Sequence, residues 1–144
     1  MKKIISLYKK HREVVTYLVA GVLTTAVNFA VYSLCVELFS LDVTLSNLVA
    51  WLFAVTFAFF ANKLYVFKSR SAKASRLVYE ALTFFASRLL SGAFEVLLPG
   101  ILMGAGLDQS LFGVDGMLAK LAVSLFVIVF NYVAGKLLVF KRKE

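Results

Sequence analysis

Two charged residues, Arg88 and Glu95, stand within a long segment, residues 81–107, that is otherwise uncharged. A charge at the centre of a membrane helix costs about 2.5–3.5 kcal/mol on insertion scales, and such residues usually mark functional sites. Their spacing of seven residues puts them on one helix face, about 10.5 Å apart along the axis. We expect Arg88 to bind an anionic head group and Glu95 to contact a polar or protonated partner. The alternative is that both residues join helices through neighbouring hydroxyls and amides.

A second polar patch lies in the uncharged segment 14–36, where Thr24, Thr25 and Asn28 occupy adjoining turns. Counting residues from the basic end of each segment puts Asn28 at about the depth of Glu95. We expect Thr24 and Asn28 to offer hydrogen bonds to a sugar or a phosphate. The alternative is a set of interhelical hydrogen bonds, each worth about 0.6 kcal/mol.

A short motif occurs twice: residues 61–68 read A-N-K-L-Y-V-F-K, and residues 134–141 read A-G-K-L-L-V-F-K. Such self-similarity indicates one helical-hairpin unit present twice, and repeats in membrane proteins point to a site between the copies. The repeated lysines, Lys63 and Lys136, are expected to attract phosphate at the cytoplasmic mouth. The alternative is that they anchor helix ends and set topology.

Two asparagines, Asn62 and Asn131, lie near these lysines, and we expect them to contact the same group. The second copy has Gly135 where the first has Asn62. This departure argues against equal roles for the two halves.

Hydropathy supplies the elements that position these residues. The 144 residues are 61% hydrophobic, whereas a soluble domain is about 45–50% apolar. Segments of about 20 residues cross a bilayer about 30 Å thick. We predict an all-α integral membrane protein, a single transmembrane domain over residues 1–144, in which Pro99 bends or ends the third span. The four predicted membrane helices cover about residues 14–36, 44–62, 79–103 and 117–138.

The charge distribution predicts the orientation. Fourteen of the sixteen Lys and Arg residues lie before the first span, after the second span or in the segment 136–144 at the end of the chain. This is the positive-inside pattern, so both termini are expected on the cytoplasmic side of a cytoplasmic membrane. Two hairpins of the same orientation are parallel repeats, related by an axis along the membrane normal. The same distribution argues against nucleic acid as a partner of this chain of net charge +8.

Several function classes lack the residues that they need. The sequence has one Cys, Cys35, and one His, His11, which lies in a basic tail. No Ser/His/Asp set, acidic dyad, glycine-rich phosphate loop or CxxC pair occurs. We therefore predict no enzyme, no catalytic residue, no metal and no cofactor. The charged N-terminal segment does not fit a cleaved signal peptide, so the first span is expected to be retained.

Three motifs carry a resemblance to a known family: Y-L-V-A-G-V-L-T-T-A-V-N-F at 17–29, F-F-A-N-K-L-Y-V-F at 59–67 and F-N-Y-V-A-G-K-L-L-V-F at 130–140. With them the chain resembles, over about residues 14–141, the GtrA-like family of small four-helix bacterial membrane proteins. The resemblance implies movement of a polyprenyl-phosphate-linked monosaccharide to the outer leaflet, for glycosylation of a cell-surface polysaccharide. It also admits assistance to the membrane glycosyltransferase that makes this lipid.

The residues fit that implication, because the polyprenyl chain stays in lipid while only the phosphate and sugar cross. Glu95 is the carboxylate available as a proton carrier if movement is coupled to an ion gradient. The cations expected at the phosphate are Arg88, Lys63 and Lys136. The groups expected at the sugar are Asn28, Thr24 and Glu95.

Two other functions stay open. In a small proton-coupled exporter of cations or drugs, Glu95 would bind the cation and a proton in turn, but Arg88 on the same face argues against it. In a non-transporting scaffold, the chain would recruit or stabilise the glycosyltransferase. The expected partners are the lipid-linked sugar, membrane lipid, that glycosyltransferase and a second copy of the chain, because four short helices enclose little volume.

Overall fold

The computed structural model describes residues 2–111 and 113–141, with side chains from His11 onward, and is built from helices. Two of the four α-helices run directly into a five-residue π-helix. The elements are α1 (Lys2–Glu37), α2 (Val43–Ala61), η1 (Asn62–Val66), α3 (Ala74–Gly104), α4 (Met117–Ala134) and η2 (Gly135–Val139).

Four helical stretches are long and apolar enough to cross a membrane: His11–Glu37, Val43–Val66, Ala74–Gly104 and Met117–Val139. This result confirms the prediction of an all-helical chain with four spans. Each span predicted from the sequence lies inside one of these stretches. The chain divides into two compact units, the first ending at Ala74 and the second beginning at Ser75.

The first helix begins earlier than hydropathy indicates. The backbone is helical from Lys2, with a kink at His11, where φ is −111° and ψ is 16°. The basic segment that the sequence analysis treats as a tail is therefore helical, and His11 marks the change of direction. Hydropathy does not reveal the helical segment before His11, because it detects only the membrane-spanning part of the helix.

A tight turn joins α1 to α2 in the first unit. Ser40 takes a left-handed conformation with φ of 52°. Asp42 then caps α2, since its Oδ1 accepts hydrogen bonds from the backbone N–H groups of Thr44 and Leu45 at 3.0 and 3.1 Å. Side-chain caps of this kind contribute about 1 kcal/mol to helix stability.

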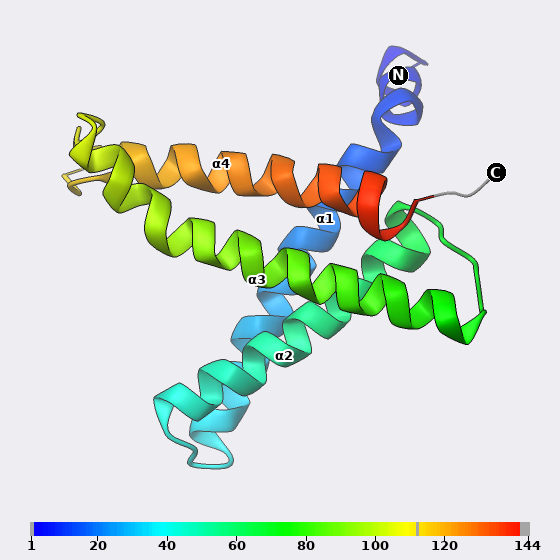
Figure 1. Cartoon of the computed structure of the whole chain (residues 1–144), viewed down its shortest axis with the longest axis horizontal. Coiled ribbons are helices and arrows are strands. Elements are labelled where there is room, and N and C mark those ends of the chain that lie inside the picture. The colour runs from blue at the N-terminus through cyan, green and yellow to red at the C-terminus, as the bar shows by residue number, and fades with distance from the viewer. Residues whose placement is uncertain (1, 112, 142–144) are drawn as a thin grey trace. The chain divides into compact units, whose positions relative to one another are not determined.

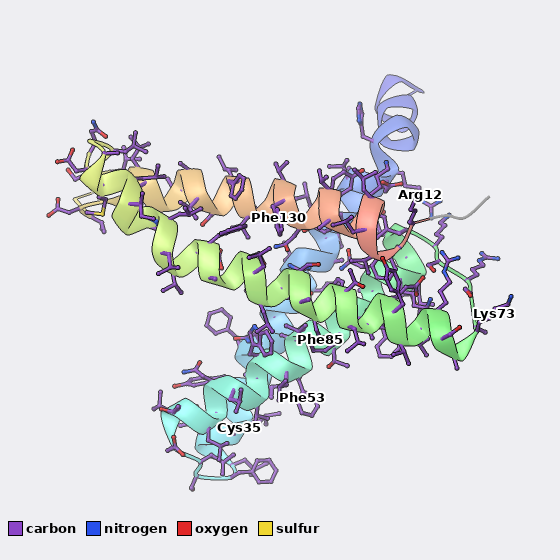
Figure 2. All side chains as sticks on the ribbon, in the orientation of Figure 1. Arg12, Cys35, Phe53, Lys73, Phe85 and Phe130 are labelled. Carbon is purple, nitrogen blue, oxygen red and sulfur yellow. The ribbon has the colours of Figure 1, made fainter. Side chains whose placement is uncertain are left out.

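Small residues line the packing of this first hairpin, in which α1 and α2 lie side by side (Figure 1). Ala20 on α1 and Ala50, Ala54 and Ala58 on α2 are buried. Small side chains let membrane helices approach closely, which is a main source of association between helices in lipid. Cys35 lies toward the turn end of the hairpin (Figure 2).

Aromatic residues pack the second hairpin, in which α3 and α4 run antiparallel (Figure 1). The ring of Phe94 on α3 lies 5.6 Å from Phe126 and 5.4 Å from Phe130, both on α4. Phe130 projects from α4 toward α3 (Figure 2). Such pairs of rings are worth about 0.5–1.5 kcal/mol beyond the area that they bury.

Pro99 does not end the third span, because α3 continues through it to Gly104. The residue removes one backbone N–H, and membrane helices tolerate this because neighbouring groups satisfy the freed carbonyl. The connection from α3 to α4 contains Gly106, Gly113 and Gly116, all with positive φ. Glycine adopts positive φ without the steric cost that other residues incur.

Candidate functional site

The repeated motif forms a π-helical turn in both copies. The Phe67 N–H donates to the Asn62 carbonyl and the Phe140 N–H donates to the Gly135 carbonyl, each at 2.9 Å. These i→i+5 bonds close η1 and η2. π-Helical turns are rare and are frequent at functional sites. The sequence shows the repeat but not this geometry, because a single widened turn leaves no hydrophobic period of its own.

Burial follows the same pattern in both turns. The Val–Phe pair that closes each turn is buried, whereas the two residues before the pair are exposed. The buried residues are Val66, Phe67, Val139 and Phe140, and the exposed residues are Leu64, Tyr65, Leu137 and Leu138. Aligned residues of the two π-helical turns are therefore buried or exposed in the same way.

The repeated lysines differ in their surroundings. The Lys63 side chain is only 6% exposed, and its Nζ donates to the Ser69 Oγ at 3.4 Å and the Ser71 carbonyl at 3.3 Å. The Lys136 side chain is exposed, and its Nζ lies 3.4 Å from the hydroxyl of Tyr132 and 5.6 Å from the centre of its ring. Lys63 is thus held against the loop after η1, whereas Lys136 lies along its own helix.

Both predicted asparagines are buried. Asn62 is 3% exposed, and its Nδ2 donates to the Ala58 carbonyl at 2.7 Å. Asn131 is 9% exposed and precedes Gly135 by one helical turn. The Oδ1 atom of each is buried without a hydrogen-bond partner among the described residues.

Arg88 lies half-buried on α3 with its guanidinium 5.0 Å from the ring centre of Phe84. Phe84 is buried, and its ring lies 6.0 Å from that of Phe140, the residue that closes η2. A cation stacked on a ring is stabilised by the ring quadrupole. The contacts therefore join Arg88 to the π-helical turn of its own unit through two aromatic rings.

Glu95 is exposed, and no ion pair joins it to Arg88 in the described part of the chain. Arg88 and Glu95, which the sequence predicts on one helix face, therefore have different environments. Ser91 between them is buried, and its hydroxyl donates to the Arg88 carbonyl at 3.1 Å.

The polar patch on α1 is held by its own helix. The Thr24 hydroxyl donates to the Ala20 carbonyl at 2.8 Å, and the Thr25 hydroxyl donates to the Gly21 carbonyl at 3.2 Å. Since each hydroxyl proton is used locally, these oxygens retain acceptor capacity only. Asn28, one turn further along, is half-buried.

Sequence reasoning missed a polar cluster at the start of α3. Glu80 is fully buried, and its Oε1 lies 3.1 Å from the Nε of Arg76. The Arg76 Nη2 also donates to the Lys141 carbonyl at 2.6 Å, and the Tyr79 hydroxyl donates to the Leu138 carbonyl at 3.1 Å. This cluster ties the start of α3 to η2 and the residues directly after it.

A sequence signal for this cluster exists. Shifting the sequence by 67 residues aligns the first span with the third and pairs Gly21 with Arg88. The same shift pairs Glu13 with Glu80 and Thr16 with Thr83. Both threonine hydroxyls donate to the carbonyl four residues earlier, at 2.7 Å in each case. Extending the repeat toward the start of each hairpin would have singled out Glu80.

These features define a multi-pass membrane protein whose two units each end in a π-helical turn beside a basic residue. Residues 16–140 match the family described as "GtrA/DPMS, transmembrane domain", and the chain belongs to this family. The resemblance seen in the sequence is thereby confirmed.

Three relatives show the range of the similarity. The chain is 36% identical to the uncharacterized membrane protein YwcD of Bacillus subtilis (strain 168), over 89% of this chain and 96% of the relative. It is 33% identical to the cell wall teichoic acid glycosylation protein GtcA of Listeria innocua, over 91% and 86%. It is 29% identical to the bactoprenol-linked glucose translocase of Shigella flexneri, over 88% and 90%. No solved structure matches the chain.

Proposed function

We propose that this protein moves a polyprenyl-phosphate-linked monosaccharide from the inner to the outer leaflet of the cytoplasmic membrane, where the sugar decorates a cell-surface polysaccharide. Membership of the family supports this proposal. The relatives add a teichoic acid glycosylation protein and a bactoprenol-linked glucose translocase at about 30% identity. In this proposal the protein is a transporter and not an enzyme.

The observation that carries the proposal is the environment of Arg88. Its guanidinium lies half-buried within a candidate membrane span, stacked on Phe84, with no ion pair among the described residues. A cation at such a position is costly unless an anion neutralises it. The planar guanidinium matches phosphate geometry with two parallel hydrogen bonds, so a lipid-linked phosphate is a suitable partner.

The other candidate residues take supporting roles in the proposal. Lys63 and Lys136 attract the phosphate at the cytoplasmic mouth, with Asn62 and Asn131 close to it. Thr24, Asn28 and Glu95 offer hydrogen bonds to the sugar, and Glu95 carries a proton if movement is coupled to an ion gradient. Membrane lipid, a glycosyltransferase that makes the substrate and a second copy of the chain are the proposed partners.

The proposed orientation has both termini and the 67–73 connection in the cytoplasm, with the two hairpins as parallel repeats. The concentration of Lys and Arg at these places supports it. Labelling of single cysteines placed at Lys73 and at Asp108 in a variant lacking Cys35 tests the orientation. Reaction of the Asp108 position alone with an impermeant reagent added outside cells is expected.

Transport in proteoliposomes tests the function. Fluorescent polyprenyl-phosphate-glucose is incorporated with the wild type, Arg88→Gln or Arg88→Lys, and its appearance in the outer leaflet is followed. We expect Arg88→Gln to lose more than about tenfold in rate, because hydrogen bonds to a charged group are worth about 1.5–3 kcal/mol. Arg88→Lys keeps the charge but loses the planar fork, so an intermediate rate is expected.

Arg70→Gln is the matched control, since it removes an exposed cation from the loop after η1. Its rate should equal that of the wild type. If folded wild-type protein moves no lipid-linked sugar while it still copurifies with a glycosyltransferase, the scaffold function replaces transport. If Arg88→Gln retains full activity, the assigned phosphate site is wrong.

A further inference from the structure

Gly92 lies on α3 one helical turn after Arg88, on the same face of the helix. A side chain in a helix leans toward the N-terminus and covers the turn before its own. Arg88 follows this rule, because its guanidinium lies 5.0 Å from the ring centre of Phe84, one turn earlier. A side chain at position 92 would in the same way lie over the turn that contains Arg88.

The fold of the second hairpin does not require glycine at position 92. The backbone there is helical, so no positive φ has to be accommodated. A Cβ atom added to Gly92 would meet no packed atom within 4 Å, and the residue is half-exposed. Glycine inside a helix is less stable than alanine. Neither backbone conformation nor crowding therefore explains the missing side chain.

The missing side chain leaves the guanidinium of Arg88 uncovered on the side away from Phe84. In the described part of the chain, its N–H groups make no hydrogen bond and no ion pair. A guanidinium carries five N–H donors in a planar fork that matches the oxygens of a phosphate. A phosphate that approaches from this side passes through the space that a larger residue 92 would occupy.

We propose that Gly92 is a positioning residue, whose lack of a side chain admits the lipid-linked phosphate to the Arg88 guanidinium. This inference rests on the proposed function and names the surface through which the substrate reaches its phosphate site. A lipid substrate is dissolved in the bilayer, so it has access to an exposed face of a membrane helix. Phe84, Arg88 and Gly92 all lie on α3, so the geometry involves one helix only.

Binding of sugar-free polyprenyl phosphate to the protein in nanodiscs of zwitterionic lipid tests the inference. At about pH 8 this phosphate monoester is almost fully deprotonated. We expect Gly92→Leu to bind it about tenfold more weakly than the wild type, because a hydrogen bond to a charged group is lost. Gly92→Ala adds only one methyl group and should cause a smaller loss.

Gly100→Leu is the matched control, since Gly100 is an exposed glycine of the same helix. A Cβ atom added there would also meet nothing within 4 Å. Gly100 lies about 18 Å along the axis from Arg88, so this variant should bind polyprenyl phosphate like the wild type.

Two further measurements separate access to Arg88 from an effect on folding. Both variants at position 92 should unfold at a temperature no lower than that of the wild type, because alanine and leucine are better helix formers than glycine. In an Arg88→Gln background, Gly92→Leu should cause little further loss of binding, because the cation that it would shield is already absent. Weaker binding by a protein of equal or higher stability is not a result of misfolding.

The remaining outcomes overturn either this inference or the proposed function. A lower unfolding temperature for Gly92→Leu would mean that another helix packs on Gly92, and the inference would be wrong. It would also be wrong if Gly92→Leu bound like the wild type, or lost binding equally in the Arg88→Gln background. If binding changes as expected but the wild type moves no polyprenyl-phosphate-glucose in proteoliposomes, the inference stands and the translocase function fails.

Discussion

The two π-helical turns have the same backbone and the same buried Val–Phe pair, yet their lysines lie in different environments. Lys63 is buried and donates to Ser69 and to the Ser71 carbonyl, while Lys136 is exposed beside Tyr132. The residues that follow explain the difference. Lys68 takes a left-handed conformation with φ of 52°, and the Ser69 N–H returns to the Lys63 carbonyl at 2.8 Å.

The repeat determines the π-helical turn but not the surroundings of its basic residue. The first copy encloses its lysine with the chain that comes next. The second copy is instead secured from α3, through Arg76 and Tyr79, which donate to the Lys141 and Leu138 carbonyls. Each turn is stabilised by a different segment, so substitutions at aligned positions should have unequal effects.

The largest difference between the units is expected at Glu80 and Glu13. Glu80→Leu should destabilise the protein by about 3–5 kcal/mol, because it leaves Arg76 without its buried carboxylate. Glu13→Leu, at the aligned and half-buried position, should cost less than half as much. Unfolding by denaturant in detergent micelles measures both. Equal losses would mean that the two units rely on the aligned carboxylates in the same way.

The next difference is expected at the lysines. Lys63→Met should cost about 1–3 kcal/mol, because the Ser69 hydroxyl and the Ser71 carbonyl lose a buried donor. Lys136→Met, at an exposed position, should change stability by less than about 0.5 kcal/mol. Thermal unfolding of the purified variants separates the two. A larger loss for Lys136→Met would remove the distinction between an enclosed and an exposed lysine.

A smaller effect is expected at the ring that holds Arg88. Phe84→Leu removes the aromatic face beneath the guanidinium, a contact worth about 0.5–2 kcal/mol, and should slow lipid transport about fivefold. Tyr17 is buried at the position aligned with Phe84, but Gly21 stands where the second unit has Arg88. Tyr17→Leu should therefore leave the transport rate unchanged, because no arginine stacks at this position. Transport rates normalised to folded protein give the comparison. Equal slowing by both would show that the rings act through packing alone.

The smallest effects should be equal in the two units. Thr16→Val and Thr83→Val each remove a hydroxyl that bonds its own helix, at 2.7 Å in both cases. We expect changes within about 0.5 kcal/mol for both, since the carbonyls keep their backbone partners. Thermal unfolding again provides the measurement. A difference above 1 kcal/mol would disprove the alignment at this position.

Much of this fold follows from the sequence, because apolar segment length and the placement of Lys and Arg reflect the bilayer directly. The four spans are readable in that way, and the repeated motif is visible in the residues themselves. The π-helical turns are not, because one extra residue in a helical turn barely alters the hydrophobic pattern. The helical segment before His11 is missed because membrane hydropathy does not report helix outside the bilayer.

The candidate site was predictable only as a set of residue types. Arg88 stands out because a charge in a span is expensive, whatever surrounds it. The burial of Lys63 depends on a backward turn at Lys68. The surroundings of Glu80 depend on Arg76, which bonds both this carboxylate and a carbonyl from the other end of the hairpin. Contacts of this kind are decided by tertiary packing, which the spacing of residues does not encode.

The shared π-helical turn also bears on the ancestry of the chain. A rare backbone feature at the same aligned position in both halves is most simply inherited from a single hairpin that already had it. On that account the gene segment for the hairpin was doubled, and the differences arose after the doubling. Gly21 opposite Arg88, and Gly135 opposite Asn62, then record how two initially identical copies specialised.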